Sequence, residues 1–220
     1  MRAVLDRLRS LLRPGAPPPV RSAEAIRAYW RHPDPDNAPE RYLGGASAAR
    51  RSAWLVQRVA AFLPREASIL ELGCNVGRNL AGLHAAGYRH LHGVEINEGA
   101  LALLRSHHPE LAAGARLHAG AAEDVLPGLG DEAYDLVFSV AVLEHVHPDS
   151  EWLFPHLARI TRHRLLTVED EHGRSPRHFP RDYRRVFEPL GLEQLEHERL
   201  GPVRAGVPRS FHARLFGRRS

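Results

Sequence analysis

The chain of 220 residues contains no lysine, so all 30 residues counted as lysine or arginine are arginine. A single cysteine, Cys74, rules out a disulfide framework and is consistent with a reducing compartment. No run of about 18 apolar residues occurs, so no membrane-spanning helix is expected. Residues 1–13 are interrupted by charge throughout and lack the apolar stretch of a secretory signal. We therefore expect a cytoplasmic protein without a membrane span.

The absence of lysine also means that the net charge of +4 rests on arginine. Complete replacement of one basic residue type by the other indicates a coding bias rather than an adaptation to nucleic acid. Arginine nonetheless binds phosphate well, so a nucleic-acid partner stays an open alternative. With 43% hydrophobic residues, the chain can bury one substantial core.

The most informative segment begins as an apolar run at Ser68 and ends in a glycine-containing turn. Residues 69–72 are typical of a buried strand, and residues 79–86 show a helical pattern. Backbone amides and a helix N-terminus therefore face whatever binds at the turn. The dinucleotide pattern G-x-G-x-x-G is not met, because Asn75 and Arg78 occupy positions that would need glycine.

The turn instead has the pattern E-x-G-x-x-x-G, which resembles the first motif of the class I S-adenosylmethionine-dependent methyltransferases. In that family the glycines let the backbone approach the methionine and ribose parts of the cofactor. Asn75 stands where the family more often has glycine, and asparagine tolerates left-handed backbone angles well. The resemblance implies that five residues of the turn contact S-adenosylmethionine: Glu71, Gly73, Cys74, Asn75 and Gly77.

A second strand is predicted over residues 91–96. Its Glu95 follows the glycine turn by about 20 residues, the separation at which a carboxylate reaches ribose hydroxyls in doubly wound folds. We therefore assign Glu95 to the ribose, and its neighbour Ile96 to the same cofactor site.

Residues 117–120 predict a third strand, and the turn after it looks like the adenine-recognition turn of the methyltransferase family. In that turn a backbone amide and an acidic or amide side chain usually face the adenine. The likeness implies that Ala122 and Glu123 contact the adenine, with Asp124 as an alternative acceptor for its amine.

Residues 134–140 predict a fourth, continuous apolar strand, and Ser139 near its end is assigned to the cofactor site. The following sequence Leu-Glu-His-Val, residues 143–146, strongly resembles the family's continuation of this strand. Four matches in the same order and at the right separations make the resemblance specific over residues 68–146.

Strand and helix patterns alternate along the rest of the chain. Further helices are expected over residues 22–30, 47–63, 150–160 and 179–190, and further strands over 164–168, 192–200 and 211–216. This alternation predicts an α/β fold, a Rossmann-like, doubly wound and mainly parallel sheet of about seven strands with helices on both faces. The last two strands could form the reversed hairpin of the methyltransferase fold.

Proline and glycine divide the chain into three parts. Residues 1–21 form a basic amphipathic segment, whose apolar stripe spans residues 4–12, and a Pro-rich linker. Residues 22–47 are expected to form a cap beside the active site, and residues 48–220 the methyltransferase domain. The apolar stripe could dock on the core, lie on a membrane surface or pair with a second subunit, so a homodimer is an open alternative.

The end of the fifth strand is expected to lie on the substrate side of the cofactor, because ligands of such sheets bind outside the carboxyl ends of the strands. Methyl transfer requires an acceptor aligned with the activated methyl group, and often the removal of a proton. We take four side chains as candidates for this catalytic role: His145, Glu169, Asp170 and His178.

A cation-assisted reaction is a weaker alternative, with Glu144 and His145 joined by Glu169 or Asp170 as ligands. The Glu144-His145 pair has a partial likeness to the metal-bearing motif of small-RNA 2′-O-methyltransferases. Ala141, however, occupies the earlier acidic position of that motif, so no metal ligand is assigned.

These observations predict an S-adenosylmethionine-dependent methyltransferase acting on a hydroxyl or amine of a small molecule, such as a sugar or specialised metabolite. An RNA or protein substrate is the first alternative. A cofactor-binding regulatory or scaffold domain without turnover is the second.

Overall fold

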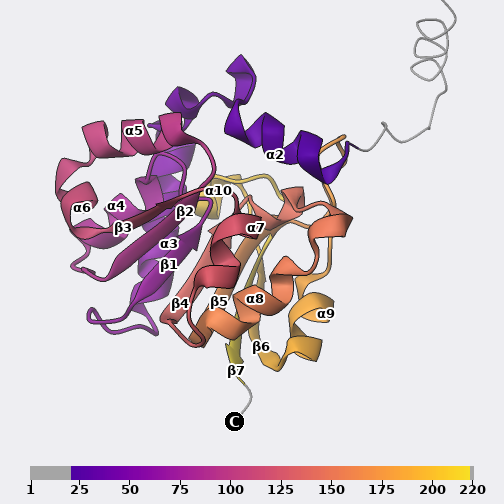
Figure 1. Cartoon of the computed structure of the whole chain (residues 1–220). Coiled ribbons are helices and arrows are strands. Elements are labelled where there is room, and N and C mark those ends of the chain that lie inside the picture. The colour runs from indigo at the N-terminus through magenta and orange to yellow at the C-terminus, as the bar shows by residue number, and fades with distance from the viewer. Residues whose placement is uncertain (1–20, 219–220) are drawn as a thin grey trace, which may run out of the picture.

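A computed structural model describes residues 21–218 as a seven-stranded sheet with helices on both faces (Figure 1). The order of the strands is β3-β2-β1-β4-β5-β7-β6. Strand β7 runs antiparallel to the other six strands. The strands span β1 Ile69–Leu72, β2 Leu91–Glu95, β3 Arg116–Ala119, β4 Tyr134–Val140, β5 Thr161–Asp170, β6 Leu192–Arg199 and β7 Phe211–Arg218.

The central strands are buried on both sides, which explains their continuous apolar sequences. Side chains alternate along a strand, so neighbours enter opposite cores. In β4, Leu136 and Phe138 belong to one core, whereas Val137 between them belongs to the other. Ile69 and Leu70 of β1 divide in the same way.

The first core contains Leu55, Leu83 and Leu104, one from each of three helices on that face of the sheet. The helices that contribute to it are α3 Ala46–Ala60, α4 Arg78–Ala85, α5 Glu98–His107, α6 Pro109–Gly114 and α10 Pro202–Ala205. The second core is covered by α7 Ala122–Val125, η3 Leu126–Gly128, α8 Leu153–Ile160 and α9 Tyr183–Phe187. The sheet is therefore doubly wound, as the sequence predicts.

Most of the remaining elements lie around the carboxyl ends of the parallel strands. Helix α2, Ala23–Arg31, starts at Ser22, whose side chain accepts a hydrogen bond from Ala25 N. It crosses above the sheet in Figure 1 and leads into two short 3₁₀ helices. The 3₁₀ helices are η1 Pro35–Asn37, η2 Pro39–Tyr42, η4 Leu143–His145, η5 Pro148–Ser150 and η6 Glu188–Leu190.

The predicted fold class is confirmed, including the reversed hairpin of β6 and β7 at the sheet edge. The helix expected over residues 179–190 is shorter, because Asp182 caps a helix that begins only at Tyr183. The helix expected from Ser150 begins at Leu153, after the separate 3₁₀ turn η5. Helices α5 and α6 are absent from the sequence-based expectations.

The predicted amphipathic segment and most of the Pro-rich linker lie outside residues 21–218. Within the described residues, no helix has both the length and the apolar character needed to cross a membrane.

Phe187 is the residue through which α9 is anchored to the sheet. Its ring contacts Phe154 of α8 and Phe216 of β7, and it is fully buried. We expect Phe187→Ala to lower the free energy of unfolding by about 3–5 kcal/mol, because it leaves a cavity in a packed core. Urea unfolding would measure this change. Val203→Ala is the control, since Val203 is 92% exposed, and a similar loss there would contradict the argument.

Candidate active site

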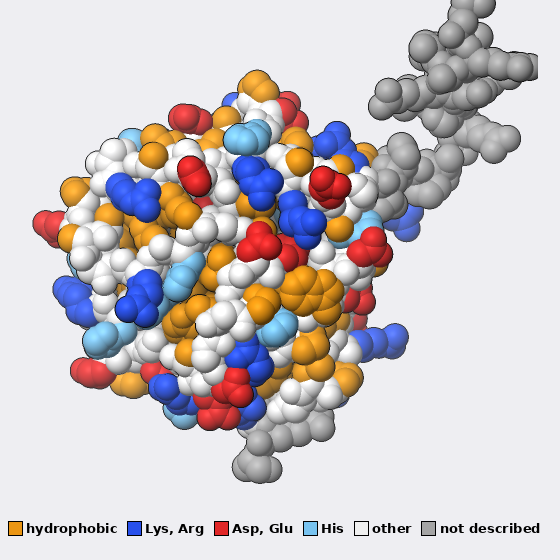
Figure 2. Space-filling model, viewed as in Figure 1, with side chains coloured by type: hydrophobic (Ala, Val, Ile, Leu, Met, Phe, Trp, Pro, Cys, Tyr) orange, Lys and Arg blue, Asp and Glu red, His pale blue; other side chains and the backbone are white. Residues whose placement is uncertain are grey.

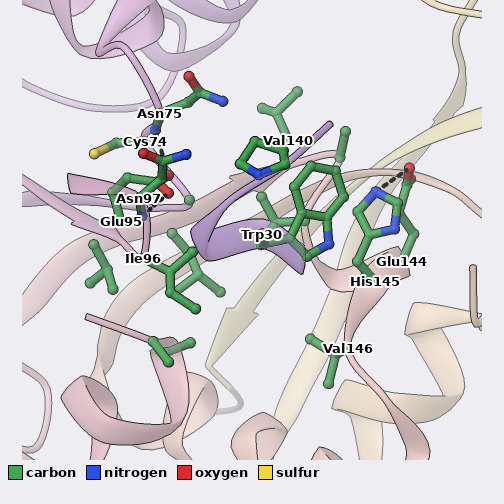
Figure 3. A pocket seen from close by; sticks show the side chains of 18 of the residues that line it. Trp30, Cys74, Asn75, Glu95, Ile96, Asn97, Val140, Glu144, His145 and Val146 are labelled. Carbon is green, nitrogen blue, oxygen red and sulfur yellow. Dashed lines mark hydrogen bonds and ion pairs between the residues drawn. The ribbon is translucent and has the colours of Figure 1, made fainter. Parts of the chain in front are cut away.

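A cavity of about 430 Å³ opens at the carboxyl ends of β1, β2 and β4. Figure 3 shows Asn75, Glu95 and Ile96 on one side of it, and Glu144 and His145 on the other. The cavity therefore has a first end at the glycine turn and a second end at η4. This is the position that ligands take in open parallel sheets.

Close backbone packing at the first end requires glycine. Gly73 has φ +67°, and a Cβ atom there would lie 2.5 Å from Val142 Cγ2. Gly77 has φ +74°, and a Cβ atom there would meet Leu104 at the same distance. Asn75 takes φ +48°, in the left-handed region that asparagine tolerates. The sequence pattern of the turn thus follows from its backbone geometry.

The Glu95 carboxylate holds this end of the cavity together. One oxygen accepts a hydrogen bond from Asn75 N and the other from Asn97 N, both at 2.8 Å. Burial raises the pKa of Glu95, and the backbone hydrogen bonds partly offset this effect. Glu95 therefore joins the end of β2 to the turn after β1, with its remaining lone pairs available at the cavity wall.

Ionisable side chains with one unpaired polar atom each also line the cavity. Glu71 accepts a hydrogen bond from Asn79 Nδ2 at 2.6 Å, but its second oxygen, Oε2, is buried without a partner. Burial raises the pKa of Glu71 to about 8. The Nε atoms of Arg51 and Arg78 are likewise buried without partners. The cavity thus offers both an acid and guanidinium groups to one ligand.

The segment from α2 to η2 covers the cavity through contacts with several other parts of the fold. The Trp30 ring lies 4.7 Å from the ring of His145, and the guanidinium of Arg177 lies 4.0 Å from the Tyr29 ring centroid. Arg27 Nη1 is 3.7 Å from Glu123 Oε1 on α7. Trp30 lies between the two ends of the cavity in Figure 3.

At the second end, two histidines surround the buried Glu144. His178 Nε2 is 3.0 Å from Glu144 Oε1, and His145 Nε2 is 3.6 Å from the same oxygen. The hydrogen bond to Glu144 raises the pKa of His178. Burial lowers the pKa of His145, although Glu144 acts in the opposite direction.

Ten of the fourteen side chains assigned from the sequence line this cavity. They are Glu71, Gly73, Cys74, Asn75, Glu95, Ile96, Ala122, Glu123, His145 and His178. Gly77 does not reach the wall, but it shapes the turn below it.

Ser139, Glu169 and Asp170 are placed elsewhere, contrary to the expectation that they face the ligands. Ser139 Oγ donates to Glu169 Oε1 at 2.7 Å, and Glu169 is completely buried. The other Glu169 oxygen accepts from Val142 N and Glu144 N, so this carboxylate holds the turn after β4. We correct the prediction for Glu169 on this ground, because its acceptor oxygens are already used and it does not line the cavity.

Asp170 also accepts hydrogen bonds from the local backbone, and it does not line the cavity. Its Oδ1 accepts from His172 N and Gly173 N, and its Oδ2 from Ser210 Oγ. Burial opposes ionisation of Asp170, but these hydrogen bonds outweigh it and lower the pKa. The prediction that Asp170 faces the acceptor is therefore corrected in the same way.

Several lining residues were not assigned from the sequence. Asn97 caps α5, and the Asn-Glu start before the apolar residues of that helix was a usable signal. Ser175 and Arg177 follow the fifth strand, whose end was expected on the substrate side, but Arg51 had no such signal, because only the folding of distant segments brings it to the cavity.

Fold and site together define an α/β domain with a ligand-sized cavity at the carboxyl ends of its strands. A family model of a methyltransferase domain matches residues 69–164. No curated protein matches the chain in sequence.

Solved structures show the same fold over nearly the whole chain. Magnesium protoporphyrin IX methyltransferase from Synechocystis PCC 6803, with bound S-adenosylhomocysteine, has a TM-score of 0.69 at 17% identity, covering 90% of this chain and 100% of that chain. The 1,6-didemethyltoxoflavin-N1-methyltransferase of Burkholderia thailandensis has a TM-score of 0.67 at 16% identity, covering 93% and 94%. Phosphoethanolamine N-methyltransferase 1 of Haemonchus contortus has a TM-score of 0.66 at 14% identity, covering 90% and 50%.

Residues 69–164 thus match a methyltransferase domain, and the chain has the fold of class I S-adenosylmethionine-dependent methyltransferases, as the sequence predicts. The cofactor of this class is S-adenosylmethionine, and the cavity fits it. Its amino-acid group carries an ammonium and a carboxylate, which match the unpaired Glu71 oxygen and the unpaired nitrogens of Arg51 and Arg78. The glycine turn leaves room for close approach to the backbone.

A substitution of Glu95 tests the first end of the cavity. We expect Glu95→Ala to weaken binding of S-adenosylhomocysteine by roughly 1–3 kcal/mol, because both the turn and any ligand hydroxyl lose an acceptor. Calorimetric titration would measure the loss. Glu98→Ala is the matched control, since Glu98 is exposed and only three residues away. Equal affinities for the two variants would contradict this role of Glu95.

Proposed function

We propose that the protein transfers a methyl group from S-adenosylmethionine to a hydroxyl or amine of a small molecule. The observation that carries this proposal is the cover over the second end of the cavity, where Trp30 and Tyr42 from the N-terminal segment join His145 and Arg177 in the wall. A cavity of about 430 Å³ suits small ligands, and a covered one suits an acceptor that can be enclosed. Solved methyltransferases with this fold that are named for a porphyrin, a toxoflavin precursor and phosphoethanolamine support a small-molecule acceptor.

In this proposal the first end of the cavity holds the cofactor. Glu71 binds its ammonium group, Arg78 its carboxylate and Glu95 its ribose hydroxyls. Ile96 and Ala122 lie where the adenine would bind. Glu123 is the remaining acidic residue of this wall, and its pairing with Arg27 joins the cover to the adenine side.

The second end of the cavity aligns the acceptor. When bound, S-adenosylmethionine supplies an activated methyl group, so the protein must chiefly position the nucleophile and exclude water. Trp30 gives a flat apolar surface against His145, and Arg177 stacks on Tyr29 at the rim. An acceptor enclosed by these rings is held away from bulk solvent.

A nucleic-acid acceptor is less well supported. On the face shown in Figure 2, arginine and carboxylate side chains are interspersed. Several arginines also pair with acids in the described chain, among them Arg159 with Asp131 and Arg162 with Asp135. A phosphate backbone is best bound by arginines left free on one face. The interspersed pattern therefore favours the small-molecule proposal.

The raised pKa of Glu71 leads to a prediction about protons. Glu71 is largely protonated at pH 6.5, since its pKa is about 8. A ligand ammonium beside it favours the ionised form, so binding of S-adenosylhomocysteine should release a proton. We expect the binding enthalpy at pH 6.5 to differ between buffers of different ionisation enthalpy, and the affinity to rise between pH 6 and about 8.

Glu71→Gln should remove this buffer dependence. Glu66→Gln is the control, because Glu66 is exposed at the other end of β1 and should leave the proton release unchanged. A binding enthalpy that is equal in all buffers for the wild-type chain would show that Glu71 does not exchange its proton with the ligand.

The acceptor class can be tested by labelling. The protein is incubated with S-adenosylmethionine carrying a deuterated methyl group, together with separate metabolite, RNA and protein fractions. We expect the mass label in the metabolite fraction, because the covered cavity encloses a small acceptor. Gly73→Val is the inactive control, since a side chain at this turn fills the cradle. Label found only in RNA or protein would overturn the proposed acceptor class.

A further inference from the structure

Three potential metal ligands converge at the second end of the cavity. Glu144 Oε1 lies 3.0 Å from His178 Nε2 and 3.6 Å from His145 Nε2, and one ligand atom of each residue lies within 4.8 Å of the others. Ligands bound to one ion at about 2.0–2.1 Å lie roughly 3.3 Å apart in a tetrahedral shell. The spacing of these atoms therefore suits a single ion.

The tautomer of His145 is fixed by its second nitrogen. His145 Nδ1 lies 2.7 Å from the carbonyl oxygen of Arg177. A carbonyl oxygen only accepts hydrogen bonds, so Nδ1 carries the hydrogen. In the neutral ring Nε2 then presents its lone pair toward Glu144, as a metal ligand must.

The other two side chains are oriented in the same way. His178 Nδ1 is 2.9 Å from Ser175 Oγ, which leaves Nε2 for the cluster. Glu144 Oε2 accepts a hydrogen bond from Asp170 N, which leaves Oε1. Metal-binding histidines and carboxylates almost always have such partners on their outer atoms. All three groups here have one.

The fold holds the cluster from two distant segments. Glu144 and His145 are adjacent in η4, and the buried Glu169 accepts from the backbone of this turn. His178 follows β5, and Phe179 N beside it donates to Glu144 O at 2.8 Å. The ligand atoms are thus placed by backbone hydrogen bonds on both segments, which is the preorganisation that a metal site requires.

We propose that Glu144, His145 and His178 form a binding site for a divalent transition-metal ion in the wall of the methyl-transfer cavity. Two imidazoles and one carboxylate favour first-row ions such as Zn²⁺, Mn²⁺ or Co²⁺ over Mg²⁺, which prefers oxygen ligands. Three protein ligands leave a coordination position for an acceptor oxygen. The ion would lower the pKa of a bound hydroxyl, whose proton passes to water. This role rests on the proposed function, but metal binding itself does not.

The test uses the full-length protein, stripped with a chelator and dialysed. Calorimetric titration with Zn²⁺, and visible absorption with Co²⁺, should show one site per chain. Glu144→Gln and His178→Gln should each weaken this binding by about 100-fold or more, because each removes a ligand. Retained binding of S-adenosylhomocysteine would show that the variants are folded.

Because the chain has 15 histidines, a control for chance binding is needed. His197→Gln serves, since His197 is exposed on β6 and stacks on His212 outside the cavity. It should leave the one-site binding unchanged. No other three His, Cys, Asp or Glu groups converge in this way within residues 21–218.

The metal proposal is overturned if the stripped protein binds no ion at a one-to-one ratio. It is equally overturned if Glu144→Gln and His178→Gln bind the ion as the wild type does. Should Glu144→Gln fail to fold, His145→Gln tests the same site and carries the same expected loss. Stoichiometric binding without transfer to any metabolite would instead contradict the proposed function and leave the metal site standing.

Discussion

The hydrogen bonds of the Glu95 carboxylate determine the geometry of the first end of the cavity. This side chain stands at the end of β2, and its two oxygens accept from the backbone of Asn75 and Asn97. One contact fixes the turn after β1, and the other fixes the start of α5. A buried carboxylate is costly unless it is hydrogen-bonded, and these two N–H groups satisfy it. These two hydrogen bonds therefore join three segments at the cavity floor.

Glu169 performs the same task at the other end of the cavity. Its oxygens accept from Ser139 and from the backbone of Val142 and Glu144, so the turn after β4 is held from the neighbouring strand β5. Burial raises the pKa of Glu169, and the nearby Glu144 adds to the effect. A carboxylate in this position supports η4, which in turn presents Glu144 and His145 to the cavity. Glu169 therefore helps to position Glu144 and His145.

The segment from α2 to η2 and the cavity wall beneath it together restrict the size of the proposed acceptor. Trp30 packs against His145, while Tyr29 stacks against Arg177 of the loop after β5. Asn37 donates to the Tyr29 hydroxyl and accepts from Tyr42, so the cover is internally braced. An acceptor reaching the second end of the cavity must fit beneath this braced segment. This constraint connects the proposed small-molecule substrate with the proposed metal site.

The sequence by itself determined the fold class and the geometry of the first end of the cavity. The motif from Glu71 to Gly77 and the later Glu95 are encoded by local patterns, namely a buried strand, a turn that needs left-handed angles, and a fixed separation. The second end of the cavity was decided by the tertiary structure. Glu144, Glu169 and Asp170 are all acidic, and only the packing of β4 against β5 determines which of these carboxylates lines the cavity. His178 lies 34 positions from Glu144, and loop closure brings the two together. Local patterns carry no information about such pairings, because their energy arises only when distant segments meet.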